Sequence, residues 1–378
     1  MTFLIVVASG VALLALVHLV VGWFVANGLH REMLAVRPRC KDLAVRVREV
    51  SSDRIVLEAP GPRQDTGHPG TLGLVWEGGH GRVGDLLDVD GTRFIRRFEP
   101  MRGMPPICVG ELESCPPVEL DPHVFWDPGD VCLPFQTVTY RSPLGDMEAW
   151  LVPGGSPDTW AIHCHGWAAE RRELVRMLPT FNRHGLTSLV IDYRNDPDRP
   201  ADPSARHQFG MTEWEDLEAA VQWVLDRGAE QVVLTGCSTG GALVMSFLER
   251  SRLAEAVTGI VLDAPNLVLS EVIRHGTGDM RATPLMIDFG MWIAHLRWGV
   301  DWEATNFVER ASQILRIPVL VFHGTSDQTV PISVSRRLGA LVPELVELVE
   351  SPAAGHVLSW NANPERYERY LENFLDRI

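Results

Sequence analysis

The stretch that decides the fold reads QVVLTGCSTGGALVMSFLER and runs from Gln231 to Arg250. It begins with an apolar, strand-like run and continues from Ala242 with the composition of a helix. Between the two lies G-C-S-T-G, the G-x-S-x-G pattern of a nucleophile elbow, in which a serine occupies a sharp turn from strand to helix. We therefore predict that Ser238 is a nucleophile. The alternative is a glycine-rich strand-to-helix turn of another α/β protein, because this short pattern often occurs by chance.

Two later segments supply the partners that a serine nucleophile needs. The strand-like run 317–322 leads into the sequence HGTSD, which places Asp327 in a loop at the carboxyl end of a strand. A further strand-like run, 346–350, is followed by a loop of small residues that carries His356. The chain order Ser, Asp, His is the one that accompanies a nucleophile elbow, and it differs from the orders in other serine-hydrolase folds. We predict that His356 takes the proton of Ser238 and that Asp327 orients the imidazole.

Each partner has a competitor in the sequence. Asp263 is the alternative acid, because it directly follows the apolar run 260–262. Asp327 is favoured because its loop lies one strand later and is richer in turn residues. His356 is favoured among the chain's 13 histidines because it alone follows the last predicted strand.

A fourth segment predicts an oxyanion hole. The strand-like run 159–164 ends at an HGW turn, and such a turn can aim a backbone N–H at a developing oxyanion. We predict that the N–H groups of Trp167 and Thr239 form the hole. An alternative takes His163 and His165, with the cysteine between them, as a metal site, but a third ligand at suitable spacing is missing. We therefore expect neither a metal nor a cofactor.

From about Phe135 to the C-terminus, the chain resembles the α/β-hydrolases of the esterase, lipase and serine aminopeptidase-like branch. The matching motifs are HG at 165–166, GCSTGG at 236–241, LDAP at 262–265, HG, D and VP within 323–331, and GH at 355–356. The segment DYRNDP at 192–197 and the helix from Thr212 resemble a membrane-anchored bacterial subgroup. The resemblance implies a mostly parallel central sheet flanked by helices, and catalysis through a serine acyl-enzyme. One departure is the small pair Cys237 and Thr239 around the nucleophile, where a larger pair such as Trp and Met is expected.

An insertion of about 266–312 separates the strand-like runs 257–262 and 317–322. In this fold the junction commonly holds a helical cap, whose aromatic and Met side chains would line an acyl pocket. The alternative is that these helices only pack their own apolar faces. The large apolar side chains of the insertion are Met280, Met286, Phe289, Met291, Trp292, Trp298, Trp302 and Phe307.

The N-terminal segment, 1–30, predicts a transmembrane anchor. No charged side chain precedes Arg31, and the apolar run 3–26 exceeds the about 20 residues that cross a bilayer. A signal peptide is the alternative, but a basic start is absent and a small-residue cleavage site is weak. The flank after the run is basic, which predicts a single-pass membrane protein with its catalytic domain on the cytoplasmic side. The basic residues of the flank are Arg31, Arg37, Arg39, Lys41, Arg46 and Arg48.

The segment 31–134 predicts a small β-rich module, and 135–378 the hydrolase domain. Strand-like runs in the module alternate with Gly- and Pro-containing turns. The glycines Gly79, Gly81 and Gly84 match a dinucleotide fingerprint formally, but no long helix follows them, so hairpin turns explain them better. The strand-like runs of the module are 43–50, 54–59, 71–76 and 92–98.

Composition argues against nucleic acid as a partner, but it does not decide whether the cysteines are oxidised or reduced. The net charge of −15 argues against binding to nucleic acid. The six cysteines show no metal-binding spacing. Cys108 and Cys115 are expected to pair if the protein is exported, and to stay reduced if the domain is cytosolic.

These features together predict a serine hydrolase that cleaves a carboxylic ester or related acyl bond. The membrane segment and the apolar cap favour a small-molecule or lipid-like acyl substrate. A serine aminopeptidase or an acyltransferase would use the same residues, and a non-catalytic scaffold of the same fold is the alternative from another class.

Overall fold

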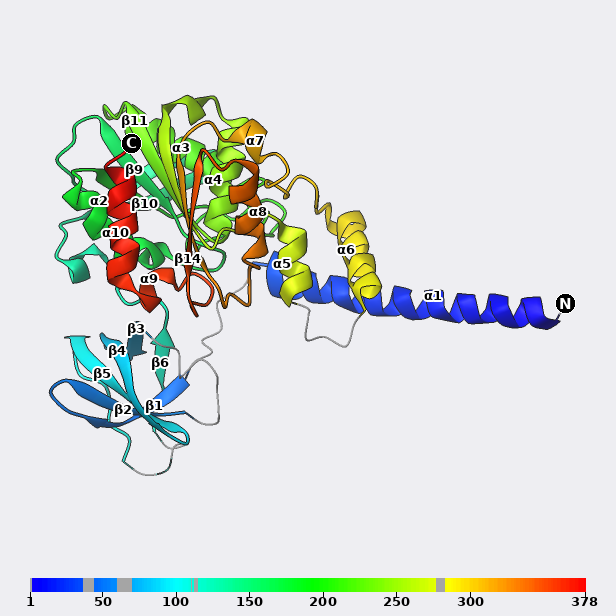
Figure 1. Ribbon diagram of the computed structural model, residues 1–378, viewed down its shortest axis with the longest axis horizontal. Coiled ribbons are helices and arrows are strands. Elements are labelled where there is room, and N and C mark those ends of the chain that lie inside the picture. The colour runs from blue at the N-terminus through cyan, green and yellow to red at the C-terminus, as the bar shows by residue number, and fades with distance from the viewer. Residues whose placement is uncertain (1, 37–43, 60–69, 110, 112–114, 277–282) are drawn as a thin grey trace.

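A computed structural model describes residues 2–36, 44–59, 70–109, 111, 115–276 and 283–378, with side chains in the first helix from residue 16 onward. The described chain forms an α/β unit, a small β-barrel and a long N-terminal helix (Figure 1).

The α/β unit is built on an eight-stranded sheet with the order β14-β13-β12-β11-β9-β10-β8-β7. The six strands β9 to β14 run parallel to one another, and β8 and β7 complete one edge in antiparallel pairing. The strands are β7 (Gln136–Ser142), β8 (Gly145–Val152), β9 (Thr159–Cys164), β10 (Thr187–Ile191), β11 (Gln231–Cys237), β12 (Val257–Asp263), β13 (Val319–Gly324) and β14 (Val346–Ser351).

Helices cover both faces of this sheet, because successive residues of a buried strand point to opposite sides. Val232 and Leu234 of β11 lie in one apolar core with α3, α4 and α8, whereas Val233 lies in the other with α2 and α10. The helices are η5 (Arg171–Met177), α2 (Leu178–Arg183), α3 (Trp214–Leu225), α4 (Thr239–Arg250), η6 (Arg252–Ala256), α7 (Ala311–Ile314), α8 (Ser333–Leu341), α9 (Ser359–Ala362) and α10 (Pro364–Leu375). The carboxyl ends of the parallel strands therefore share one edge, where sheets of this kind build their sites.

The N-terminal module is a closed six-stranded barrel with the order β1-β2-β5-β4-β3-β6. The hairpin expected at the glycine pattern is present, because β3 pairs with β4 in antiparallel register and Trp76 lies opposite Gly79, although the three glycines lie within β4 and not in the turn itself. A side chain at Gly81 would collide with the Phe98 ring, so glycine permits the close packing of β4 on β5. The strands are β1 (Ala44–Val50), β2 (Arg54–Glu58), β3 (Leu72–Trp76), β4 (Gly79–Asp90), β5 (Arg93–Arg102) and β6 (Val118–Asp121), and the short helix η4 (Pro128–Val131) follows them.

Between β5 and β6 the structure joins Cys108 to Cys115 by a disulfide. Of the two states expected from the sequence, the paired one is present. The other cysteines in the described chain, Cys132, Cys164 and Cys237, are free.

The N-terminal segment is the helix α1 (Thr2–Leu29), followed by a π-helical turn, η1 (His30–Leu34). The prediction of a single-pass membrane protein with a cytoplasmic catalytic domain was wrong. No helix in the described part of the chain is long and apolar enough to cross a membrane.

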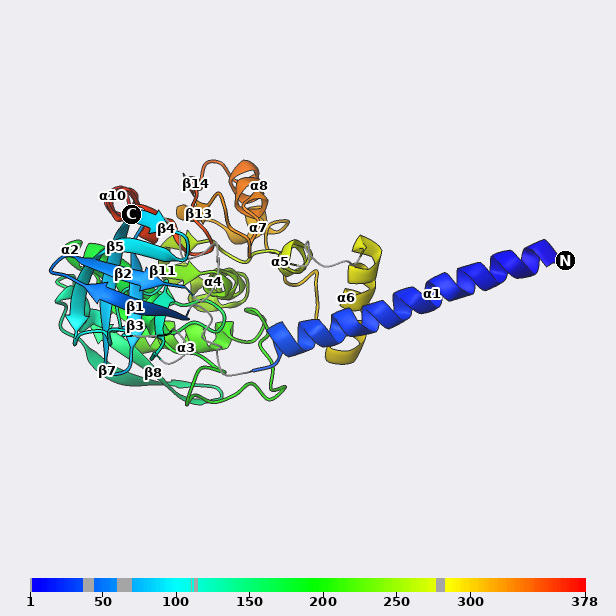
Figure 2. The same cartoon turned by 90° about the horizontal axis from the view of Figure 1, so that it is seen from below.

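The apolar side chains near the end of α1 instead pack within the protein. The helix crosses α6 (Pro284–Trp298) close to α5 (Leu269–Gly276) (Figure 2). Val25 and Leu29 share an apolar cluster with Ile287 and Met291 of α6. An apolar helix can bury its side chains against protein as well as in lipid. The apolar sequence pattern alone therefore led to the wrong prediction of a membrane segment.

Candidate active site

The turn after β11 holds Ser238 in a backbone conformation that L-residues rarely adopt, with φ 48° and ψ −114°. Two glycines make the turn possible. A Cβ atom at Gly236 would lie 2.5 Å from the backbone of Gly240, and one at Gly240 would collide with the carbonyl oxygen of Cys164. The turn also receives backbone support, because the N–H of Ser238 donates to the carbonyl of Asp263 at 2.9 Å. The result is a strained serine presented between a buried strand and helix α4.

This strain predicts that Ser238→Gly is more stable than Ser238→Ala by about 1 kcal/mol in free energy of unfolding, because glycine adopts positive φ without cost. Both variants lack the hydroxyl group, so the difference reports the backbone alone. Urea denaturation measures it. The matched pair Ser312→Gly and Ser312→Ala, at an exposed position within helix α7, should give the opposite order. Equal stabilities at position 238 would contradict the strain.

Ser238, His356 and Asp327 come together at the carboxyl edge of the sheet, from the segments after β11, β14 and β13. The Oγ of Ser238 lies 2.9 Å from Nε2 of His356, and Nδ1 of His356 lies 2.7 Å from Oδ2 of Asp327. The other carboxylate oxygen, Oδ1, accepts the backbone N–H groups of Thr329 and Val330 at 2.8 and 2.9 Å. These contacts fix Asp327 in orientation and leave the serine hydroxyl facing a ring nitrogen.

His323, at the end of β13, is a further support that the sequence did not reveal. Its Nε2 lies 3.3 Å from Oδ2 of Asp327 and 3.0 Å from the carbonyl oxygen of Val330. Burial raises the pKa of the Asp327 carboxyl, but hydrogen bonds from His323 and His356 and the charge of His356 outweigh burial and lower that pKa. Asp327 is therefore ionised at neutral pH and can stabilise a positively charged His356.

The turn after β9 fixes the peptide between Gly166 and Trp167. The carbonyl oxygen of Gly166 lies 3.1 Å from the Tyr193 hydroxyl and 2.9 Å from Nδ1 of His165. In a planar trans peptide, the N–H of Trp167 points opposite to that carbonyl. A side chain at Gly166 would be crowded, since a Cβ atom there would lie 3.1 Å from Cβ of Ser238. The orientation of the Trp167 N–H next to the nucleophile is therefore set by its neighbours.

Thr239, the other predicted oxyanion donor, is the first residue of α4. N–H groups in the first turn of a helix have no partner within the helix, and the helix dipole adds partial positive charge there. Trp167 and Thr239 both line the cavity above Ser238. Their role as an oxyanion hole remains a prediction.

His165 is buried, and its surroundings favour the charged form of its ring. Its Nδ1 faces the carbonyl oxygen of Gly166, and its Nε2 lies 2.9 Å from Oδ2 of Asp196, so both ring nitrogens face acceptors. Burial lowers the pKa of His165, but the charge of Asp196 and its hydrogen bond outweigh this and raise the pKa to about 9. Ligand atoms of His165, Asp192 and Asp196 lie within 4.8 Å of one another. However, a metal ligand needs a free ring nitrogen, and Asp192 already pairs with Arg171 at 2.8 Å.

Glu173, in η5, is a site residue that sequence reasoning missed. Its Oε2 accepts the N–H of Gly166 at 2.6 Å, and its Oε1 lies 3.5 Å from Nε2 of His123, which follows barrel strand β6. Burial raises the pKa of the Glu173 carboxyl, but His123 and the charge of Arg176 outweigh burial and lower it to about 2. Glu173 thus connects the barrel to the turn that presents the Trp167 N–H. No short motif marks this residue, because its partners lie far away in the sequence.

We expect Glu173→Ala to lower kcat about 10-fold to 100-fold with little change in KM, because the peptide that aims the Trp167 N–H loses its anchor. Glu173→Gln keeps a side-chain acceptor for the Gly166 N–H and should retain most of the activity. Steady-state kinetics, corrected for the folded fraction, measures both. A loss of equal size in the two variants would argue for a purely electrostatic role of the carboxylate.

Asp263, the alternative acid, lies elsewhere in the site. Its Oδ2 is 3.2 Å from Nη2 of Arg176, and both side chains are buried. Burial raises the pKa of Asp263, and the charge of Arg176 opposes that rise. The ring of His356 bonds Asp327 and Ser238 instead. Asp263 therefore lies beneath the nucleophile, as the partner of a buried arginine.

A cavity of about 740 Å³ lies above Ser238 and His356. Helix α1 contributes Phe24, Val25, Gly28 and Leu29 to its walls, and helix α5 contributes Val272, Ile273 and Gly276. The expectation that the large cap side chains line this pocket was wrong for those that the structure describes, since none of them lines it. Met280 lies outside the described residues. On α6, Phe289 and Met291 pack on α1 instead, and no residue of α6 is among the described residues that line the pocket.

Comparisons with known proteins agree with this architecture. Residues 151–370 match the model described as "Alpha/beta hydrolase family", and residues 46–106 match a domain of unknown function (DUF8805). The uncharacterised protein YfhR of Salmonella typhimurium is 26% identical over 242 residues, covering 59% of this chain and 74% of that protein. An uncharacterised Mycobacterium tuberculosis protein is 28% identical over 216 residues, covering 56% and 68%. The Pyrococcus furiosus esterase Pf2001 superposes with a TM-score of 0.53 at 19% identity, covering 67% of this chain and 96% of the esterase. The family model spans more than half of this chain. The chain therefore belongs to the alpha/beta hydrolase family and is a hydrolase.

Proposed function

We propose that the protein is a serine esterase that cleaves a small-molecule carboxylic ester through an acyl-enzyme. The observation that carries the proposal is the continuous chain of hydrogen bonds from Ser238 through His356 to Asp327, at the floor of a cavity. A serine hydroxyl is a weak nucleophile at neutral pH, and this arrangement is the one that activates it.

The reaction follows from the positions of the groups. His356 takes the proton from Oγ of Ser238 as the oxygen attacks the ester carbonyl. The N–H groups of Trp167 and Thr239 stabilise the oxyanion that forms, and ionised Asp327 stabilises the imidazolium. His356 then gives its proton to the departing alcohol. Water enters, loses a proton to His356 and attacks the acyl-enzyme, which releases the acid and restores Ser238.

The walls of the cavity favour an ester over the amide of an amino acid. An aminopeptidase needs a free carboxylate to hold the substrate's amino group. Among the described residues that line the cavity, the carboxylates are Glu32 and Glu173. Glu173 is bonded to Gly166 and His123, and Glu32 lies 2.5 Å from Arg31, whose positive charge opposes the binding of a second cation there. Most other lining side chains are apolar, which suits an apolar acyl group.

A fluorophosphonate probe and a panel of substrates test the proposal. We expect the purified protein to form a covalent adduct, located on Ser238 by mass spectrometry, and to hydrolyse p-nitrophenyl esters but not aminoacyl p-nitroanilides. Labelling should drop strongly in His356→Ala, because the hydroxyl then has no base. Folded protein that reacts with neither probe nor ester would instead be a non-catalytic scaffold, and cleavage of the anilides would identify an aminopeptidase.

A further inference from the structure

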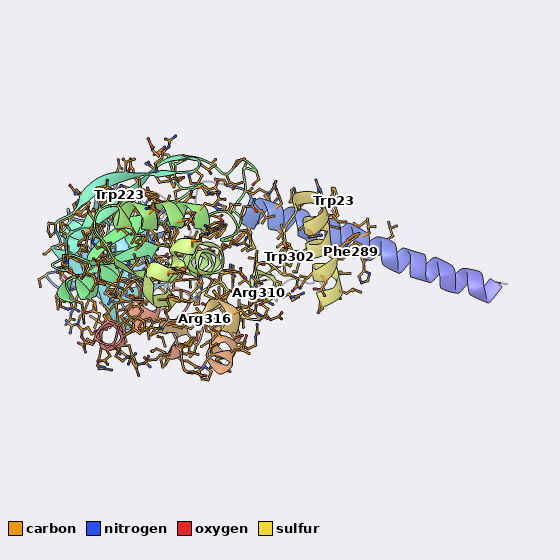
Figure 3. The ribbon with its side chains drawn as sticks, turned by 90° about the horizontal axis from the view of Figure 1, so that it is seen from above. Trp23, Trp223, Phe289, Trp302, Arg310 and Arg316 are labelled. Carbon is orange, nitrogen blue, oxygen red and sulfur yellow. A yellow bond between two sulfur atoms is a disulfide. The ribbon has the colours of Figure 1, made fainter. Side chains whose placement is uncertain are left out.

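The roof of the active-site cavity is the end of helix α1. Its lining residues Phe24, Val25, Gly28 and Leu29 are spaced so that they fall on one face of the helix. Figure 3 shows Trp23 and Phe289 where α1 crosses α6. A Cβ atom at Gly22 would lie 2.7 Å from the Phe289 ring, so α6 holds this part of α1 closely. Helix α6 therefore packs on the part of α1 that leads into the cavity-lining residues.

Gly28 is the unusual position of this roof. A Cβ atom at Gly28 would meet no described atom within 4 Å, although the residue lies in a helix and lines the cavity. Glycine within a helix is unfavourable relative to alanine, so its presence needs a reason. The close approach of Phe289 supplies one for Gly22, and Val25 does the same for Gly290. At Gly28, next to the cavity that this residue lines, a side chain would have open space before it among the described residues.

We infer that the space at Gly28 receives the distal part of the substrate's acyl chain, so that α1 sets the acyl length that the enzyme accepts. The inference rests on the proposed function, because the acyl chain is positioned by its bond to Ser238. The cavity that Gly28 lines has apolar side chains in its walls, among them Leu29 on α1, Phe209, and Ile273 on α5. Each methylene that leaves water there should raise kcat/KM about 4-fold, until the chain meets the end of the cavity.

The variant Gly28→Leu tests the inference. Leucine favours a helix over glycine, so the variant should be at least as stable as the natural protein by thermal melting. Its side chain fills the space that the acyl chain would occupy. With p-nitrophenyl esters from acetate to dodecanoate, we expect kcat/KM for octanoate and longer esters to fall at least about 10-fold more than kcat/KM for acetate. The preferred chain length therefore becomes shorter.

Gly155→Leu is the matched control. Gly155 is exposed and lies outside the lining residues, and a Cβ atom there would also meet no described atom within 4 Å. This variant should keep the natural profile. An unchanged profile in Gly28→Leu, or an equal loss for every ester, would overturn the inference while leaving the esterase function intact. If the natural protein hydrolyses no ester and Ser238 takes no fluorophosphonate, the proposed function fails and the inference fails with it.

Discussion

Ser238→Ala is expected to lower kcat for ester hydrolysis by about 10⁴-fold to 10⁶-fold, with little change in KM. The variant lacks the oxygen that forms the acyl-enzyme, so the reaction can proceed only by direct attack of water. The cavity walls and the N–H groups of Trp167 and Thr239 are unchanged, so substrate binding should persist. Stopped assays at high enzyme concentration measure the residual rate.

Measuring the melting temperature distinguishes a loss of kcat in Ser238→Ala from a loss of folded protein. Alanine and serine have similar preferences at φ 48°, so the melting temperature of Ser238→Ala should stay close to that of the natural protein. Ser312→Ala, at an exposed serine of α7, should change neither stability nor rate. If Ser238→Ala kept more than about a tenth of kcat, the nucleophile would be another group and the acyl-enzyme mechanism would not hold.

The parts of the site that sequence could predict are those encoded in short segments. The elbow at Ser238 needs glycines two residues away on each side, and this steric requirement is readable from a few letters. Asp327 and His356 follow strands whose apolar runs are equally local. For that reason the expected nucleophile, acid and base could be named before their distances were known. Their catalytic roles remain predictions, which the variants Ser238→Ala, His356→Ala and Asp327→Asn test.

The parts that sequence could not predict depend on contacts between distant segments. Glu173 contacts Gly166 and His123, and no sequence pattern around Glu173 indicates either contact. The apolar run of α1 was assigned to a membrane, because hydropathy records that a segment avoids water and not what covers it. The same limit applied to the cap, where composition predicted apolar helices correctly but not that α1 would lie between α6 and the cavity.

The second large effect is expected from Asp327→Asn, which should lower kcat by about 10⁴-fold. The geometry explains why an amide is so damaging. Oδ1 of Asp327 accepts two backbone N–H groups, from Thr329 and Val330, so the amide oxygen of asparagine must take that position. The amide nitrogen then faces Nδ1 of His356. A donor in that place favours the tautomer with its proton on Nε2, which cannot accept the proton of Ser238.

Asp263→Asn gives the contrasting result that identifies the acid. Asp263 is buried against Arg176, so neutralising it leaves the guanidinium without its charged partner, at a cost of about 3–5 kcal/mol in free energy of unfolding. The kcat of the protein that remains folded should stay within about 10-fold, because His356 keeps its bond to Asp327. Urea denaturation and fluorophosphonate titration of active sites separate the two quantities. If Asp263→Asn instead lost kcat while stability stayed the same, and Asp327→Asn remained active, Asp263 would be the acid of the relay and the observed pairing of Asp327 with His356 would be incidental.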